Sequence, residues 1–221
     1  MKTKNLLLMI VCILQGLAAV AQELPVKSWN GDNRRPLVVY ISGDGGLNSF
    51  TNDFCTTINK SGYTVAAINA RSYFWSKKTP EQAAADIAAY VEAALKGRQN
   101  QQMTLIGYSF GADVAPFIIN RLPGAAKRSL ASTILMAPSA STDFEIHIAD
   151  MWGKAKKRGM DVISEINKMG ATRTAIIRAA DDKDFPVQLI TLKNCRNEVL
   201  RGGHHFDGDT GFLAATVLKY F

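Results

Sequence analysis

Histidine and cysteine are scarce in this sequence, which limits the chemistry available to it. The chain has 3 of each among 221 residues. His204 and His205 are adjacent, so their rings point in different directions, and His147 lies far from them in the sequence. We therefore expect no metal site and no cofactor. Cys55 lies in a predicted helix and Cys195 at the start of a predicted strand, and nothing in the sequence brings them together. We expect no disulfide between them.

Repeats, low-complexity tracts and flexible linkers are also absent. Hydrophobic residues make up 47% and charged residues 20% of the chain, as in ordinary globular proteins. No nucleic-acid-binding motif is present, and basic residues do not alternate with aromatic ones. We therefore expect residues 22–221 to form a single domain that does not bind nucleic acid.

The only long apolar run lies at the N-terminus. Basic residues precede an apolar stretch over 6–20, and Ala19-Val20-Ala21 has the small-residue pattern of a cleavage site. The run is short for a membrane span and lacks a stop-transfer flank. We predict a cleaved signal peptide over residues 1–21, a periplasmic mature protein and no transmembrane span after cleavage. Removal of Lys2 and Lys4 with the leader lowers the net charge from +7 to +5, a modest positive balance that suits work beside anionic lipid headgroups.

Strand-like and helix-like segments alternate after the leader. Strands are predicted at 36–42, 64–70, 103–108, 130–136, 173–178 and 197–200, and helices at 48–61, 80–95, 112–122 and 210–220. Several of the strand runs are continuously apolar, which is typical of a parallel sheet buried on both faces. The pattern predicts an α/β fold, with a mostly parallel sheet covered by helices on both faces.

The segment 139–171 is the one candidate for a lid. Residues 143–148 could form a short strand, and the basic run 154–158 is interpreted as a solvated helix face in preference to a lipid contact. The segment is too short for a large cap, so we expect an open cleft.

The central motif is Gly107-Tyr108-Ser109-Phe110-Gly111, between a predicted strand and a predicted helix. A serine in this context lies on a tight, strained turn with its hydroxyl exposed, and the glycines avoid collisions with neighbouring backbone. Ser109 is the candidate nucleophile. The alternative is an ordinary strand-to-helix turn with a surface serine.

A serine hydroxyl needs a base, and the base needs an acid to orient it. In folds with this turn the order along the chain is serine, acid, histidine. Asp182 is preferred as the acid, with Asp181 and then Asp184 as alternatives, because many such hydrolases have Gly-x-x-Asp-x-x-Val-Pro here. His205 is preferred over His204 as the base, because a Gly-His-Phe pattern is common at that place.

The oxyanion of an acyl-transfer intermediate needs backbone N–H donors. Phe110, directly after the nucleophile, should supply one. The glycine-rich turn after the first strong strand should supply the other, with Asp44 preferred and Gly45 next.

Together these motifs resemble the bacterial VirJ/AcvB virulence-protein family of the α/β-hydrolase superfamily. The matching stretches span nearly the whole mature chain: SGDGG at 42–46, RSYFW at 71–75, TPEQAAAD at 79–86, GYSFGADV at 107–114, NRLP at 120–123, DFEIH at 143–147 and GGHHFDGD at 202–209. Leu47 stands where the family usually has tryptophan. The acid loop departs from the family pattern at Ala179, which leaves the identity of the acid open.

The resemblance implies an α/β-hydrolase fold and a periplasmic serine esterase acting on aminoacyl-phosphatidylglycerol, notably the lysyl form. Carboxylates of Asp44, Asp113 and Glu145 would then face the cationic aminoacyl group, and Arg71 or Arg121 the phosphate. Two other functions remain open: a general carboxylesterase or lipase, and a non-catalytic accessory factor of a secretion or virulence system.

Overall fold

The computed structural model describes residues 24–147 and 157–221. The predicted signal peptide lies outside the described residues. Within them, no helix combines the length and the apolar character needed to cross a bilayer.

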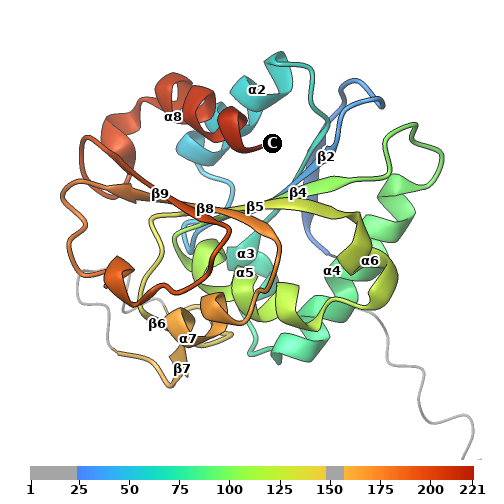
Figure 1. The fold of residues 1–221 in the computed structure, drawn as a ribbon. Helices are drawn as coiled ribbons and strands as arrows, with labels where there is room; N and C mark the ends of the chain where they lie inside the picture. The colour runs from blue at the N-terminus through green and yellow to red at the C-terminus, as the bar shows by residue number, and fades with distance from the viewer. Residues whose placement is uncertain (1–23, 148–156) are drawn as a thin grey trace, which may run out of the picture.

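A seven-stranded sheet forms the centre of the molecule (Figure 1). Its order is β1-β3-β2-β4-β5-β8-β9. The bounds are β1 Val26–Trp29, β2 Leu37–Ile41, β3 Val65–Ile68, β4 Met103–Tyr108, β5 Leu130–Met136, β8 Arg173–Ala179 and β9 Cys195–Leu200. Only β1 runs antiparallel, against β3; all the other pairings are parallel.

Helices cover both faces of this sheet (Figure 1). One face carries α2 (Ser49–Lys60), α8 (Thr210–Val217) and the 3-10 turn η4 (Leu218–Tyr220), and the other carries α3 (Ala70–Tyr73), α4 (Pro80–Leu95), α5 (Phe110–Arg121), α6 (Gly124–Ser129) and α7 (Val162–Asn167). Short turns η2 (Val187–Leu189) and η3 (Phe206–Gly208) and a two-stranded ribbon of β6 (Ser141–Thr142) and β7 (Met160–Asp161) lie in the loops. The prediction of a mostly parallel sheet with helices on both faces is confirmed.

The alternation of side chains along β2 explains why the sheet needs both layers. Leu37, Val39 and Ile41 enter one hydrophobic core, whereas Val38 and Tyr40 enter the other. All five are buried. Burying each such side chain contributes about 1.5–3 kcal/mol, so a helix layer on one face alone would leave half of this stabilisation unused.

Helix α4 begins and ends where its sequence predicts. Thr79 and Gln82 form a reciprocal capping box around Pro80, which satisfies backbone donors of the first turn. Gly97 follows the last residues with a φ of +80°, a conformation that glycine adopts without strain.

The segment 139–171 differs from its prediction. The described part of 143–148 is not a strand, because Phe144 and Ile146 pair irregularly with the loop after α3: the Phe144 carbonyl accepts from Lys78 and the Ile146 N–H donates to Phe74. Both side chains are buried, so the alternation of apolar and polar residues here reflects burial of Phe144 and Ile146 and not pairing with a strand. Within the predicted helical run 154–158, residues 154–156 lie outside the described residues, and 157–158 are not helical. In its described part the segment forms no large cap.

Candidate active site

Ser109 lies on a strained turn between β4 and α5. Its φ is 52° and its ψ is −121°, in the region that non-glycine residues rarely adopt. The flanking glycines make this turn possible. A Cβ on Gly107 would lie 2.4 Å from the Gly111 carbonyl oxygen, and one on Gly111 would lie 2.1 Å from the Ile41 carbonyl oxygen. The sheet and helix therefore approach too closely for any side chain at either position.

Three side chains from three loops meet at this turn. The Nε2 atom of His204 lies 2.8 Å from the Ser109 hydroxyl oxygen, and its Nδ1 atom lies 2.6 Å from a carboxylate oxygen of Asp182. The loops follow β4, β8 and β9, which are parallel, so their carboxyl ends lie at one edge of the sheet. With a neutral imidazole, Nδ1–H can donate to the carboxylate while Nε2 accepts from the hydroxyl. This arrangement can activate an alcohol as a nucleophile.

The prediction of His205 as the base was wrong, because His204 is the histidine that contacts Ser109 and Asp182. The His205 ring is exposed and packs edge-on against Phe50, with ring centroids 5.7 Å apart. The loop turns at Gly203, whose carbonyl accepts from Phe206 N–H, and Phe206 has a φ of 52° that buries its side chain beneath the turn. Consecutive side chains diverge in such a turn, so His204 faces the serine and His205 the solvent.

Tyr108 fixes the histidine loop from the strand side. Its hydroxyl donates to the backbone carbonyl of His204 over 3.1 Å. Burial raises the pKa of the Tyr108 phenol well above its ordinary value, so the group remains a donor at neutral pH. The position of the imidazole therefore depends on β4 itself, the strand that ends directly before Ser109.

Among the three candidate acids, the structure brings only Asp182 to the histidine. Asp181 is exposed and its backbone N–H donates to the Gly202 carbonyl over 3.2 Å. Asp184 is exposed and lines the cleft beside Ser109 without contacting His204. The spacing that favoured Asp182 thus agrees with the geometry.

The two preferred oxyanion donors also lie at this cleft. Asp44 and Phe110 both line it, and within the described residues neither backbone N–H donates a hydrogen bond. Phe110 is the first residue of α5, where the helix leaves its N–H groups unpaired. Gly45, the alternative, does not line the cleft.

The cleft itself has a volume of about 840 Å³ and is rich in carboxylates. Asp44, Glu145 and Asp184 make no side-chain hydrogen bond or ion pair within the part of the chain that the structure describes. Asp161, by contrast, accepts from Ser164 N–H as the N-cap of α7. Several negative charges therefore face the cleft without a partner among residues 24–147 and 157–221.

Asp113, predicted to contact substrate, lies buried under the cleft wall. Its carboxylate accepts from Ser139 N–H over 2.6 Å. Burial, aided by the nearby negative charges of Asp44 and Asp182 and opposed by the hydrogen bond from Ser139, raises the pKa of the Asp113 carboxyl to about 8. Asp113, one helical turn after Ser109, therefore ties α5 to the loop after β5. A substrate contacts its carboxyl only through a group that reaches the floor of the cleft.

The two predicted phosphate ligands do not line the cleft. Arg121 lies at the end of α5 and forms ion pairs of 2.7 Å with both Glu81 and Glu165. Arg71 is exposed on α3, with its Cβ against the glycine turn. The structure instead brings Lys157 and Arg158 to the cleft.

A second contact between a histidine and a carboxylate, formed by His147 and Asp143 in the cleft, was not predicted. His147 Nε2 lies 2.7 Å from a carboxylate oxygen of Asp143, and Arg158 lies 3.8 Å from the same oxygen. The spacing of four residues between Asp143 and His147 is the sequence signal that could have indicated this pair. Among residues 24–147 and 157–221, this pair included, no three potential ligands converge in a way that could hold a metal ion.

The model of one protein family, described as bacterial virulence protein (VirJ), matches residues 35–221. The chain belongs to the VirJ family. A comparison with curated proteins finds no match.

Solved structures place the VirJ chain among α/β-hydrolase folds. A candidate non-heme bromoperoxidase, BpoC from Mycobacterium tuberculosis H37Rv, has a TM-score of 0.65 at 18% identity, covering 90% of this chain and 96% of that one. The hydrolase olei00960 from Oleispira antarctica has a TM-score of 0.64 at 13% identity, with coverages of 91% and 96%. The Paleococcus ferrophilus monoacylglycerol lipase has a TM-score of 0.60 at 12% identity, with coverages of 90% and 100%. At these identities the likeness shows the fold alone.

Proposed function

We propose that this VirJ-family protein is an exported serine hydrolase that cleaves the aminoacyl ester of an aminoacyl-phosphatidylglycerol, the lysyl form above all. The observation that carries the proposal is the hydrogen-bonded series from Ser109 through His204 to Asp182 at a strained turn. The predicted leader at residues 1–21 supports a periplasmic location.

The first half of the reaction acylates the enzyme. His204 Nε2 takes the proton of the Ser109 hydroxyl while Oγ attacks the ester carbonyl carbon. The resulting oxyanion faces the N–H groups of Phe110 and Asp44. When the bond to the glycerol oxygen breaks, the imidazolium returns its proton to that oxygen, and phosphatidylglycerol leaves with the aminoacyl group bound to Ser109.

The second half releases the amino acid. His204 takes a proton from water, whose oxygen attacks the acyl carbon, and the proton then passes to Ser109 Oγ as the acyl bond breaks. Asp182 keeps its negative charge throughout and stabilises the imidazolium that forms in each half. The net reaction consumes one water and yields the amino acid and the lipid alcohol.

The charges of the cleft support a cationic acyl group. Asp44, Glu145 and Asp184 are available to the α-ammonium group of an aminoacyl ester and to the second ammonium group of a lysyl ester. Lys157 and Arg158 line the same cleft, and their positive charges are suited to contact the phosphodiester of the lipid headgroup. Neutral acyl esters would leave those carboxylates without a counter-charge.

The test compares substrates on the purified mature protein. Release of lysine from lysyl-phosphatidylglycerol vesicles and hydrolysis of p-nitrophenyl butyrate are measured for the wild type and Ser109→Ala. We expect the serine variant to lose both activities and the wild type to prefer the aminoacyl lipid. Preference for the simple ester would reduce the function to that of a general carboxylesterase. Full lysine release by Ser109→Ala would refute the mechanism.

A pair of substitutions that removes two carboxylate charges with little change in side-chain shape tests the substrate assignment. Asp44→Asn with Glu145→Gln keeps the backbone donors and should raise KM for the lysyl lipid while leaving the neutral ester unaffected. Asp53→Asn with Glu92→Gln, at exposed positions of α2 and α4 outside the cleft, removes the same number of charges and serves as the matched control. Equal KM values in all three proteins would show that the carboxylates do not select the substrate.

A further inference from the structure

A second hollow lies at the opposite end of the sheet from Ser109. It has a volume of about 480 Å³ and lies where β8 and β9 begin, beside the C-terminal turn η4. Its charged lining residues are all basic: Arg173, Lys193, Arg196 and Lys219. We call this hollow the basic groove.

Strand alternation places the two arginines on one face of the sheet. Ala175 and Ile177 of β8 enter the core beneath α2 and α8, so Arg173 shares that face by its odd number. Leu200 of β9 enters the same core. Arg196 lies four residues before Leu200, so the two side chains start from the same face of the sheet. Both guanidinium groups therefore start from the side of the sheet on which η4 lies.

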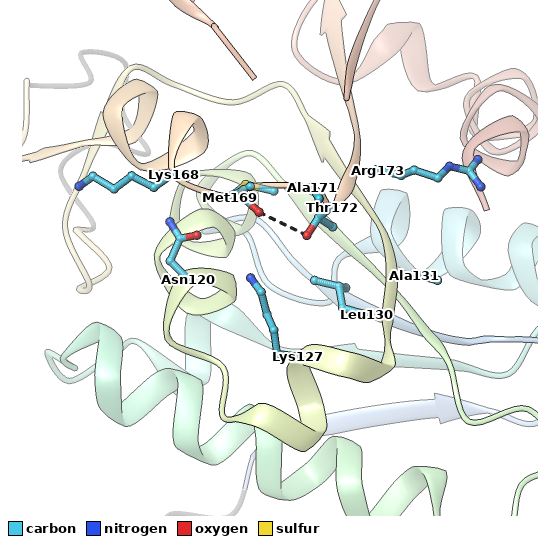
Figure 2. Close-up of a pocket in the computed structure, with 10 residues that line it drawn as sticks. Asn120, Lys127, Leu130, Ala131, Lys168, Met169, Ala171, Thr172 and Arg173 are labelled. Atoms are coloured by element: carbon cyan, nitrogen blue, oxygen red, sulfur yellow. Dashed lines mark hydrogen bonds between the residues drawn. The ribbon is translucent and has the colours of Figure 1, made fainter. Parts of the chain in front are cut away.

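Figure 2 shows the neighbouring hollow on the other side of Arg173. The Arg173 side chain points away from Lys127 and Met169 there, as expected if it serves the basic groove. In that neighbouring hollow the Lys127 ammonium already donates to the Ile119 carbonyl over 2.8 Å. Asn120 and Lys168 of that hollow both bond to Glu165, so its cations other than Arg173 already have partners within the protein.

In the part of the chain that the structure describes, the four charges of the basic groove have no carboxylate partner. Within the described residues, none of the four forms an ion pair, whereas Arg121, Lys168 and Arg201 each do. Glu198, the nearest acid on β9, accepts a hydrogen bond from the Tyr220 hydroxyl and does not line the groove. Four like charges in one hollow repel one another, and the single carboxylate of Glu198 on the same face of β9 does not balance them, so a bound anion would lower the energy of the folded state.

We propose that the basic groove binds a phosphate group. Two guanidinium groups offer paired donors that match phosphate oxygens, and two ammonium groups add flexible donors from the loop before β9 and from η4. A hollow of about 480 Å³ has room for a phosphate and the group that carries it.

The basic groove is separate from the cleft. Strand β8 begins at Arg173 in the groove and ends just before the loop of Asp182, so at about 3.3 Å per residue the two sites are roughly 20 Å apart. A phosphate in the groove therefore contacts none of the groups that act on an ester at Ser109, and both sites can be filled at once.

The test uses a groove variant and a charge-matched control. The groove variant carries Arg173→Gln, Lys193→Gln, Arg196→Gln and Lys219→Gln; the control carries Lys60→Gln, Lys77→Gln, Lys96→Gln and Arg128→Gln, all exposed residues outside the groove. Binding of inorganic phosphate is measured by calorimetry, and binding to vesicles with and without phosphatidylglycerol by flotation. Thermal unfolding without ligand checks that each variant folds, and Arg173→Gln with Arg196→Gln replaces the groove variant should it not fold.

The wild type should bind phosphate or phosphatidylglycerol vesicles, and the groove variant should bind about tenfold or more weakly. The control and Ser109→Ala should bind as the wild type does. Loss with inorganic phosphate identifies a free phosphate compound as the ligand, and loss with vesicles alone identifies a lipid headgroup. The proposal is overturned if the wild type binds neither probe, or if the groove variant and the control weaken equally.

Discussion

The adjacent histidines allow a sharp comparison of two near-identical substitutions. His204→Gln removes the ring nitrogen that lies 2.8 Å from the Ser109 hydroxyl, and with it the base. Removing a general base costs about 10²- to 10⁴-fold in rate. At about 1.4 kcal/mol for each tenfold change, this is roughly 3–5 kcal/mol of transition-state stabilisation. The second-order rate of Ser109 modification by a fluorophosphonate should fall accordingly.

His205→Gln is the matched control. Its exposed ring contributes an edge contact with Phe50, which is worth about 0.5–1.5 kcal/mol of stability at most. The rate of fluorophosphonate modification should stay close to that of the wild type, with a small decrease in the urea midpoint. The reasoning is refuted if His205→Gln abolishes modification while His204→Gln preserves it, because the serine would then draw its reactivity from the other ring.

Further predictions concern the acid, the turn and the buried carboxyl. Asp182→Asn should lower kcat about 10⁴-fold by favouring the wrong tautomer, with Asp181→Asn unchanged in the same esterase assay. Gly111→Ala should destabilise the fold by about 3 kcal/mol or more in urea unfolding, because its Cβ would lie 2.1 Å from a backbone oxygen, whereas Gly159→Ala should stay within about 0.5 kcal/mol. Asp113 has a pKa of about 8 in the fold against an ordinary value of 3.8, so the folded state holds more protons than the unfolded state between these values. Stability should therefore fall by up to about 1.4 kcal/mol per pH unit from pH 4 to pH 8, and Asp113→Asn should remove that slope; identical slopes in the two proteins would contradict the burial argument.

Much of the architecture could be predicted because it depends on local signals. The strand of residues 103–108 and the turn at Ser109 follow from an apolar run and two glycines, and the structure shows why no side chain fits at either glycine. The antiparallel strand β1 could not be predicted from its polar residues, since the strand with which it pairs, β3, is distant in the sequence. The predicted strand at 143–148 failed for the reverse reason, because an alternating pattern marks burial and not the presence of a neighbouring strand.

The site divides in the same way. Asp182 could be placed from its spacing after a strand, since the strand fixes where the loop begins. The choice between His204 and His205 could not, because it depends on the Tyr108 hydroxyl and on the left-handed backbone of Phe206, neither of which has a sequence signature. Arg121 was predicted to bind phosphate because of its positive charge, but its guanidinium group forms ion pairs with carboxylates of α4 and α7.

The most direct test of the account is the intact mass of the mature protein after treatment with a fluorophosphonate, followed by peptide mapping. The account predicts one adduct per chain, located on Ser109, absent in Ser109→Ala and formed far more slowly in His204→Gln. A protein that takes up no adduct, or takes it up on another residue, would contradict the claim that Ser109 is an activated nucleophile.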